Sequence, residues 1–307
     1  MVASSLLVTV PDTRMLDLLG PAPDGVEVTI WDMTGPAPAD HIDIVVVHYG
    51  PTPPGALERL RGVDVGLVQG QAIGYEAVVE ELPPGHVFAN AATVHEAGAA
   101  EHALALTLAS RRMLPEFASG PAGEWPAFIA GPGLLGARVL LLGYGGINQE
   151  VEARLAGFGV EVVRVASRAR ETAQGHVHGV DELPELLPGT DVVIAAVPLT
   201  PATDRLIDAG FLAALPDGAL VVNIARGRVA DTDAILAEAG RLRFALDVTD
   251  PEPLPSGHPL LSHPAVIVTP HVASRTTSLG GRQAALVRHQ IERMLAGEEP
   301  INVVHRT

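Results

Sequence analysis

Residues 136–148 read Gly136-Ala-Arg-Val-Leu-Leu-Leu-Gly-Tyr-Gly-Gly-Ile-Asn148, an apolar run that ends in a cluster of glycines. The run 138–142 has the length and composition of a buried strand. Apolar residues then recur every four positions from Ile147 to Leu155, which predicts a helix, and the β-rich run 160–166 follows. This order predicts one strand–helix–strand unit of an α/β fold.

Glycines at a strand-to-helix turn let the backbone bend sharply and approach a pyrophosphate, whose charge is stabilised by free N–H groups and the helix dipole. A purely structural glycine turn is the alternative. The segment predicts a dinucleotide site at Tyr144, Gly145, Gly146, Ile147 and Asn148. Asn148 replaces the third glycine of G-x-G-x-x-G, the position that lets the helix pack closely on the strand. The asparagine therefore either pushes the helix outward or turns its amide toward the phosphates.

The composition excludes several classes of protein. The 307 residues suggest about two domains, and a hydrophobic content of 47% is ample for filled cores. The absence of cysteine excludes disulfides and thiol nucleophiles, and the absence of lysine excludes Schiff-base catalysis and a Walker A loop. A net charge of -16 disfavours nucleic acid and anionic membranes as partners. With no membrane-length apolar run and no basic leader segment, a cytoplasmic protein is expected.

Further β-rich runs alternate with helical or turn segments on both sides of the glycine turn. This alternation predicts two doubly wound parallel-sheet (Rossmann-like) domains. Thr93 and Glu96 have the spacing of a capping box and open a long apolar helix through His102 to Arg111, expected between domains or subunits. The expected strands are 5–10, 26–31, 42–48, 65–69, 191–197, 219–224, 244–248 and 265–269, with helical stretches at 56–61 and 279–295.

Four later segments carry a more specific signal: 198–203 (Pro-Leu-Thr-Pro-Ala-Thr), 222–227 (Val-Asn-Ile-Ala-Arg-Gly), 246–255 (Leu-Asp-Val-Thr-Asp-Pro-Glu-Pro-Leu-Pro) and 269–274 (Thr-Pro-His-Val-Ala-Ser). In this order after a glycine turn, the set resembles the D-isomer-specific 2-hydroxyacid dehydrogenases. The resemblance implies an oxidoreductase acting on CH–OH groups, usually a homodimer. It also implies a substrate domain built from both chain ends, 1–97 plus 284–307, around a dinucleotide-binding domain, 98–283.

The resemblance places three catalytic residues at Arg226, Glu252 and His271. Their chemistry suits reduction of a 2-keto acid, which needs a proton at the carbonyl oxygen as hydride reaches the carbon. A histidine can act as that acid, and as the base in the reverse reaction. A carboxylate beside the imidazole favours its charged form, and an arginine can hold the substrate carboxylate bidentately. Taken singly, His271 after a proline and Glu252 in a proline-rich loop would be surface residues.

The substrate contacts implied by the resemblance are the backbone of Ala72, Ile73 and Gly74, together with Arg226 and His271. Gln71 is expected to add a polar contact. His48 and Tyr49 either face the cleft or serve only in loop packing. The remaining expected cofactor contacts are Val197, Pro198, Thr203, Ile224, Ala225, Arg226, Asp247, His271 and Ala273.

The residues after the second strand of the dinucleotide unit predict which cofactor is used. An NAD site normally has an acid there, about 20 residues past the glycine turn, to bind the ribose hydroxyls. This chain has Ser167, followed by Arg168 and Arg170. A hydroxyl and two guanidinium groups suit a 2′-phosphate, which predicts NADP as the preferred cofactor and leaves NAD possible. Ordinary solvated loop arginines are the alternative.

Three functions compete at this stage. The first is an NAD(P)-dependent reductase of glyoxylate, hydroxypyruvate or pyruvate. The second is a non-catalytic, cofactor-sensing protein of the same fold, as in the C-terminal binding protein corepressors. The third is oxidation of phosphoglycerate or formate, although the first domain offers few basic residues for a phosphorylated substrate. No metal site is expected, because His176 and His178 lie two apart in what reads as a polar loop.

Overall fold

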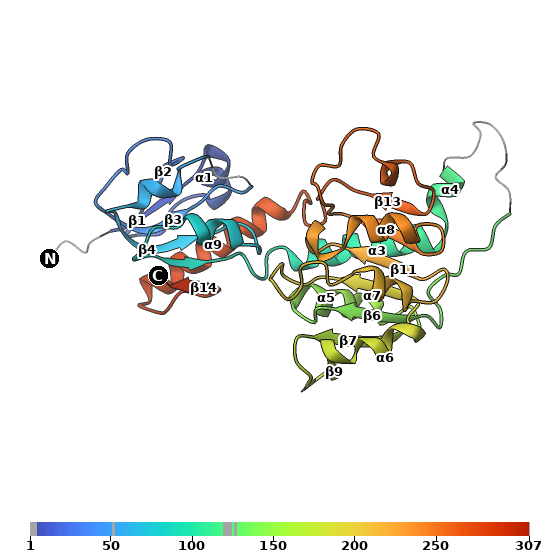
Figure 1. Cartoon of the computed structure of the whole chain (residues 1–307). Coiled ribbons are helices and arrows are strands. Elements are labelled where there is room, and N and C mark those ends of the chain that lie inside the picture. Colours follow the sequence, from blue (N-terminus) through green and yellow to red (C-terminus); the bar gives the residue numbers. More distant parts are fainter. Residues whose placement is uncertain (1–4, 51–52, 119–124, 126–127, 307) are drawn as a thin grey trace. The chain divides into compact units, whose positions relative to one another are not determined.

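The computed structural model describes residues 5–50, 53–118, 125 and 128–306. They form two compact units (Figure 1). The first unit holds the described residues up to His95 together with those from Thr276 onward, and the second is Glu96–Arg275. The helix α9 (Leu279–Leu295) belongs wholly to the first unit, whereas the sequence-based division cut it at residue 283.

The first unit is built on a six-stranded sheet in the order β14-β5-β4-β3-β1-β2. Its five N-terminal strands run parallel, and β14 pairs antiparallel with β5 at one edge. The strands are β1 (Leu6–Val10), β2 (Val26–Ile30), β3 (His41–Val46), β4 (Asp64–Gln69), β5 (Val87–Ala89) and β14 (Val303–Arg306). The helical elements are α1 (Thr13–Leu19), η1 (Leu57–Leu60), α2 (Glu76–Glu81) and α9.

Both faces of this sheet are covered by apolar side chains of the helices. Met15 of α1 and Val287 of α9 are buried against one face. Leu57 and Leu60 of η1 are buried against the other. The expected helical stretch at 56–61 is thus a single 3₁₀ turn, and it is bounded by Arg61 in an extended conformation.

The second unit is built on an eight-stranded sheet in the order β13-β12-β11-β10-β6-β7-β9-β8. All pairs are parallel except β8 with β9, which form an antiparallel edge. The strands are β6 (Arg138–Leu142), β7 (Glu161–Ala166), β8 (Arg170–Thr172), β9 (Gly175–Gly179), β10 (Val192–Ala195), β11 (Leu220–Asn223), β12 (Arg243–Leu246) and β13 (Val266–Val268). The predicted α/β class, with two mainly parallel Rossmann-like sheets, is confirmed.

Alternating apolar residues of each strand serve two cores. Leu140 and Leu142 of β6 contribute to one core, and Val139 and Leu141 contribute to the other. The helices on the first side are α6 (Leu183–Leu186), α7 (Ala209–Ala213) and α8 (Thr232–Glu238). The 3₁₀ turns of this unit are η2 (Val180–Glu182), η3 (Leu187–Gly189), η4 (Gly227–Val229) and η5 (Pro259–Leu261). The helices outside the first core are α3 (Glu96–Arg111), α4 (Leu114–Ala118) and α5 (Gly146–Leu155).

Two local expectations were wrong. His176 and His178 lie on strand β9 and not in a loop, because Val177 between them is fully buried and anchors the segment in the sheet. The helix expected directly after Thr93 begins later than the capping-box spacing placed it. Thr93 has a left-handed backbone with φ 75°, and α3 begins only at Glu96. Among the helices of the described residues, none is long and apolar enough to cross a membrane.

Candidate active site

The site residues predicted for the second unit follow the carboxyl ends of six adjacent parallel strands: β6, β7, β10, β11, β12 and β13. This edge is where open α/β sheets bind their ligands. The glycine turn follows β6, and Arg226 and His271 come shortly after β11 and β13. Glu252 lies in the loop after β12. The topology therefore gathers these segments at one edge of the sheet.

The glycine turn has the backbone that a pyrophosphate requires. Gly143 adopts φ +89°, and a side chain there would meet Val197 Cγ1 at 2.5 Å, so only glycine fits. Gly145 is the N-cap residue of α5. A Cβ at Gly145 would have no protein atom within 4 Å, which leaves open space at the helix N-terminus. That open cradle, together with the free N–H groups of the first helical turn, fits a dinucleotide phosphate.

Tyr144 takes part in the turn through its backbone, since its side chain is only 3% exposed. Its hydroxyl donates to Glu152 Oε2 at 2.5 Å, and Glu152 is also paired with Arg164. Burial, reinforced by Glu152, raises the pKa of the Tyr144 hydroxyl. The turn thus rests on a closed polar network inside the unit.

Asn148 is fully buried. Its amide nitrogen is occupied by protein acceptors, which differs from the expected orientation toward the phosphates. The amide nitrogen donates to the backbone oxygens of Gly143 at 2.9 Å and of Leu142 and Ile194 at 3.2 Å. The amide is therefore turned into the sheet and away from any phosphate. Hydrogen bonds from α5 to the ends of β6 and β10 stand here in place of the close packing that a third glycine allows.

The segment after β7 is exposed from Ser167 to Arg170. Within the described residues, the Arg168 side chain has no hydrogen-bond or ion-pair partner. Arg170 begins the edge strand β8, and its guanidinium donates to the carbonyl oxygen of Tyr144 at 3.0 Å. Arg170 therefore braces the glycine turn, while Arg168 is available to a ligand.

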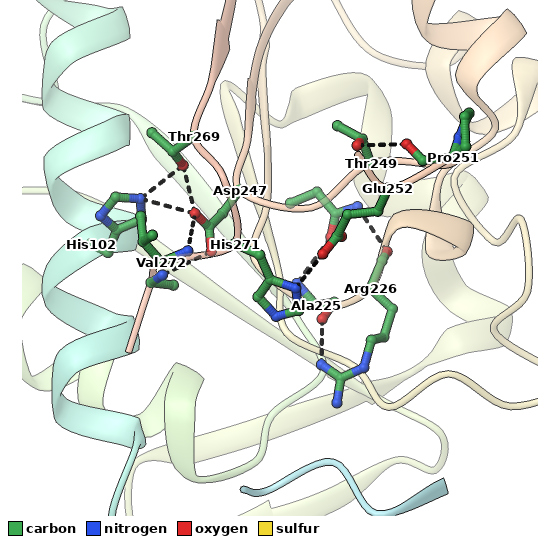
Figure 2. A network of polar contacts seen from close by, with 12 residues as sticks. His102, Ala225, Arg226, Asp247, Thr249, Pro251, Glu252, Thr269, His271 and Val272 are labelled. Atoms are coloured by element: carbon green, nitrogen blue, oxygen red, sulfur yellow. Dashed lines mark hydrogen bonds and ion pairs between the residues drawn. The ribbon is translucent and has the colours of Figure 1, made fainter. Parts of the chain in front are cut away.

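His271 and Glu252 are in hydrogen-bond contact, shown in Figure 2, with Nδ1 2.7 Å from Oε1. The two side chains are 49% and 42% exposed, so the pair is open to a ligand. His271 has φ 53°, a left-handed conformation that is rare for a residue with a Cβ. Its N–H is held by the carbonyls of Asp247 at 2.8 Å and Thr269 at 3.1 Å. Strained backbone of this kind is concentrated at functional sites.

Arg226 is half-buried, and its turn is fixed by Asn223, the last residue of β11. The Asn223 amide donates to the Arg226 carbonyl at 3.1 Å and accepts the Ala225 N–H at 3.0 Å. The guanidinium Nη1 donates to the Ala225 carbonyl at 2.7 Å. Figure 2 shows Arg226 on the same side of the loops as His271 and Glu252.

Asp247, expected at the cofactor, is 1% exposed and holds the loop that carries His271. Its carboxylate accepts the Thr269 hydroxyl at 2.6 Å and the N–H groups of Val272 and Ala273 at 2.9 Å (Figure 2). Burial alone would raise the pKa of Asp247, but these hydrogen bonds and one from His102 hold it below its usual value. Asp247 is therefore ionised and acts here on the position of the loop.

His102 is a member of this network that sequence reasoning assigned to helix packing. From α3 its Nε2 lies 3.0 Å from the Thr269 hydroxyl and 3.4 Å from Asp247 Oδ1. The sequence holds no local signal for this role, because His102 and Asp247 lie far apart in the chain. The other expected cofactor positions line the same edge: Ile224, Ala225 and Ala273 are buried, Val197 and Thr203 are half-buried, and Pro198 is exposed.

In the first unit, the loop after β4 presents backbone donors. The carbonyls of Ala72 and Ile73 accept hydrogen bonds from Ala91 and Asn90. Within the described part of the chain, the N–H groups of Ala72, Ile73 and Gly74 donate to no acceptor. This arrangement suits a carboxylate ligand.

Gln71 was expected to contact the substrate, but it is buried, and its amide donates to the Val47 carbonyl at 2.7 Å. The expectation for its side-chain nitrogen was wrong, because that amide secures the loop to the residue that follows β3. Tyr49 stacks on His95 with ring centroids 5.7 Å apart, in agreement with the loop-packing alternative.

Comparison with known proteins supports the resemblance seen in the sequence. The model of the D-isomer specific 2-hydroxyacid dehydrogenase NAD binding domain matches residues 103–273. The human glyoxylate reductase/hydroxypyruvate reductase is 34% identical over 210 residues, which are 65% of this chain and 64% of that protein. The chain thus spans a little under two thirds of this curated relative.

Two solved structures superpose over nearly the whole chain. A D-isomer specific 2-hydroxyacid dehydrogenase from Xanthobacter autotrophicus Py2, in complex with NADPH and MES, gives a TM-score of 0.81 at 29% identity and covers 99% of this chain and 98% of its own. An NADPH-dependent glyoxylate/hydroxypyruvate reductase from Sinorhizobium meliloti, in complex with NADP and malonate, gives a TM-score of 0.77 at 25% identity. The match covers 98% of this chain and 97% of that chain. With residues 103–273 of its 307 matched by the family model, this chain belongs to the D-isomer specific 2-hydroxyacid dehydrogenase family.

Proposed function

We propose that this protein is an NAD(P)-dependent 2-hydroxyacid dehydrogenase that reduces a small 2-keto acid. The observation that carries the proposal is the exposed His271–Glu252 pair at the carboxyl edge of the dinucleotide-binding sheet. A histidine–carboxylate contact alone would be a common surface feature. Here it is held by a strained backbone and a buried carboxylate beside a glycine turn that fits a dinucleotide.

The proton transfer of the proposed reaction is assigned to His271, with Glu252 as its partner. Glu252 accepts the Nδ1–H of His271, which fixes the ring orientation and leaves Nε2 to exchange a proton with the substrate oxygen. His271 donates that proton during reduction and removes it during oxidation. The bound nicotinamide supplies or receives the hydride.

The substrate carboxylate is assigned two sets of donors. Arg226 offers a guanidinium that can bind a carboxylate bidentately and orient the neighbouring carbonyl. The backbone N–H groups of Ala72, Ile73 and Gly74 offer further donors from the first unit. On this assignment, the unit holding both chain ends is the substrate domain, and Glu96–Arg275 is the dinucleotide-binding domain.

Glyoxylate and hydroxypyruvate are the first substrates to test, since the names of the human relative and the Sinorhizobium meliloti structure specify them. A phosphorylated substrate is less well suited. Before the substrate loop the first unit has only Arg14, Arg59 and Arg61, and Arg61 is already paired with Glu58. The C-terminal part of this unit adds Arg282, Arg288, Arg293 and Arg306, of which Arg293 and Arg306 are paired with glutamates.

NADP is proposed as the preferred cofactor because Ser167 stands where an NAD site has an acid, and Arg168 is exposed beside it. An acid at that position would repel a 2′-phosphate, whereas a guanidinium can pair with it bidentately. Both similar structures were obtained with NADPH or NADP, which supports the same assignment.

A homodimer is proposed from the apolar surface of the second unit. Trp125 and Phe128 are 96% and 99% exposed, and Leu135 is 87% exposed. The proposal is that these side chains form one contiguous apolar patch, since such patches mark protein contacts. Phe128→Glu should convert a dimer to a monomer in size-exclusion chromatography with light scattering, and a wild-type monomer would refute the assignment.

The function is tested by assaying 2-keto acids with NADH and NADPH and following absorbance of the reduced nicotinamide. The proposal predicts turnover with at least one small unphosphorylated acid. The competing reading, a corepressor-like protein that only senses the cofactor, predicts cofactor binding without turnover. Intact Arg226, Glu252 and His271 favour the enzyme.

A further inference from the structure

The sheet edge that holds β8 and β9 carries a pair of histidines on its solvent face. His176 and His178 are separated by Val177, which is fully buried, so both imidazoles project from the opposite side of the strand. Their side chains are 46% and 29% exposed. The two rings meet edge to face with centroids 4.6 Å apart. Neither residue has a part in the proposed reaction.

Each imidazole has a carboxylate on its Nδ1 atom. Glu171, directly across from His176 in the β8–β9 register, places Oε1 2.7 Å from that nitrogen. Glu182 in η2 places Oε2 2.7 Å from Nδ1 of His178. The other Glu182 oxygen accepts the Gly179 N–H at 2.7 Å, which fixes the carboxylate in place. This carboxylate–imidazole pairing is the arrangement that orients histidine ligands in metal sites.

His176, His178 and Glu182 also converge. One ligand atom from each of these residues lies within 4.8 Å of the other two. Ligands about 2.0–2.2 Å from one ion are at most about 4.4 Å apart. Small rotations close the site if the ion takes the place of the hydrogen bond between Glu182 Oε2 and His178, while Glu182 Oε1 keeps its contact with the Gly179 N–H. Because all three belong to one short segment, no movement of either unit is needed.

We propose that His176, His178 and Glu182 form a binding site for a divalent transition metal of the zinc class, with water completing the coordination. Two imidazole nitrogens and one carboxylate suit Zn²⁺, Ni²⁺ or Cu²⁺, whereas Mg²⁺ and Ca²⁺ prefer all-oxygen sites. Glu171 positions His176 and is not itself a ligand. The bound ion links β9 to η2 and stabilises the edge hairpin. The site is independent of the proposed reductase activity, and it revises the expectation that this histidine pair binds no metal.

The test is titration of tag-free protein with Zn²⁺ in competition with a chromogenic chelator, in parallel with a thermal melt. The wild type should bind one ion at this site and melt at a higher temperature with Zn²⁺, but not with Mg²⁺. His176→Ala combined with His178→Ala should weaken Zn²⁺ binding by tenfold or more. Glu171→Gln should weaken it by about tenfold, the lower end for loss of a partner that orients a ligand.

His41→Ala is the matched control. His41 is 55% exposed and lies between Asp43 and Asp64, so it has two carboxylate neighbours but no second imidazole. This variant should keep wild-type Zn²⁺ affinity at the β9 site. Equal Zn²⁺ affinity in the wild type and the double variant, when both melt cooperatively without metal, would overturn the proposal, and so would a wild type that binds no Zn²⁺. In that case the cluster is only a pair of surface histidines held by carboxylates.

Discussion

Gly227 packs against the carbonyl group of Thr249 so closely that a Cβ at Gly227 would lie 1.9 Å from that oxygen. Gly227 begins the turn after Arg226, and Thr249 lies in the loop that carries Glu252. The Thr249 loop is tied down by its own hydroxyl to the Pro251 carbonyl at 2.9 Å. The spacing between Arg226 and Glu252 therefore depends on the absence of a side chain at residue 227.

Gly227→Ala should separate the two loops and displace Arg226 from Glu252. We expect loss of about 1–3 kcal/mol in the free energy of unfolding, the usual cost of overpacking, and a larger proportional loss in kcat/KM. Urea unfolding and steady-state kinetics measure the two effects. Gly157→Ala is the control, because a Cβ there would meet no atom within 4 Å. Wild-type kinetics in Gly227→Ala would refute this coupling.

Asn148→Gly should destabilise the protein, because it removes the amide group whose two N–H donors are shared among three backbone oxygens. The expected loss is about 1 kcal/mol of unfolding free energy. Asn148→Asp should cost more, since a carboxylate cannot donate to those carbonyls and is repelled by them. Thermal melts of both variants check the order. A more stable glycine variant would show instead that the asparagine is a steric burden on helix packing.

Arg168→Ala and Arg170→Ala should separate cofactor recognition from support of the turn. Arg168→Ala is expected to weaken NADPH binding by about 1.5–3 kcal/mol and to leave NADH nearly unchanged, the scale for a hydrogen bond to a charged group. Arg170→Ala should weaken both cofactors, because Arg170 also braces the carbonyl of Tyr144. Fluorescence titration with each cofactor measures this. If Arg168→Ala weakened NADPH and NADH binding equally, a contact between Arg168 and the 2′-phosphate would be excluded.

The lowered pKa of the Asp247 carboxyl predicts how the stability of the fold depends on pH. Its pKa is lowered in the folded protein, so its stabilising contribution is complete above the unfolded-chain value of about 3.9 and is lost as pH falls through the folded value. Asp247→Asn should therefore be clearly less stable than wild type at pH 7, and the difference should shrink below about pH 4. Urea unfolding at pH 7, 5 and 3.5 tests this. If the difference in unfolding free energy between wild type and Asp247→Asn were the same at all three pH values, the charge of Asp247 would not contribute to stability.

The sequence predicts most of the fold because strand and helix signals are local. Arg138–Leu142 and Leu279–Leu295 lie where their apolar patterns placed them. The short strands β8 and β14 escaped prediction, since each is held by pairing with a distant or unusual partner and not by its own apolar run.

The candidate site likewise has residues with a local sequence signal and residues whose role depends on distant contacts. Arg226, Glu252 and His271 were predicted from the family resemblance of the motifs that hold them, and the structure brings His271 and Glu252 into contact. The roles of His102 and Asn223 depend on contacts between segments, which no local pattern records. Asn148 could be identified as a departure, but the direction of its amide is set by carbonyls of two neighbouring strands.

The most direct test of the proposed mechanism is the turnover of His271→Ala with NADPH and glyoxylate, or with the best acid of the panel, measured beside its affinity for NADPH. Loss of the general acid should lower kcat by about two to four orders of magnitude, while the cofactor dissociation constant stays close to wild type. Glu252→Gln should lower kcat less, because it leaves the imidazole in place. A His271→Ala protein that binds NADPH and retains full turnover would contradict the account.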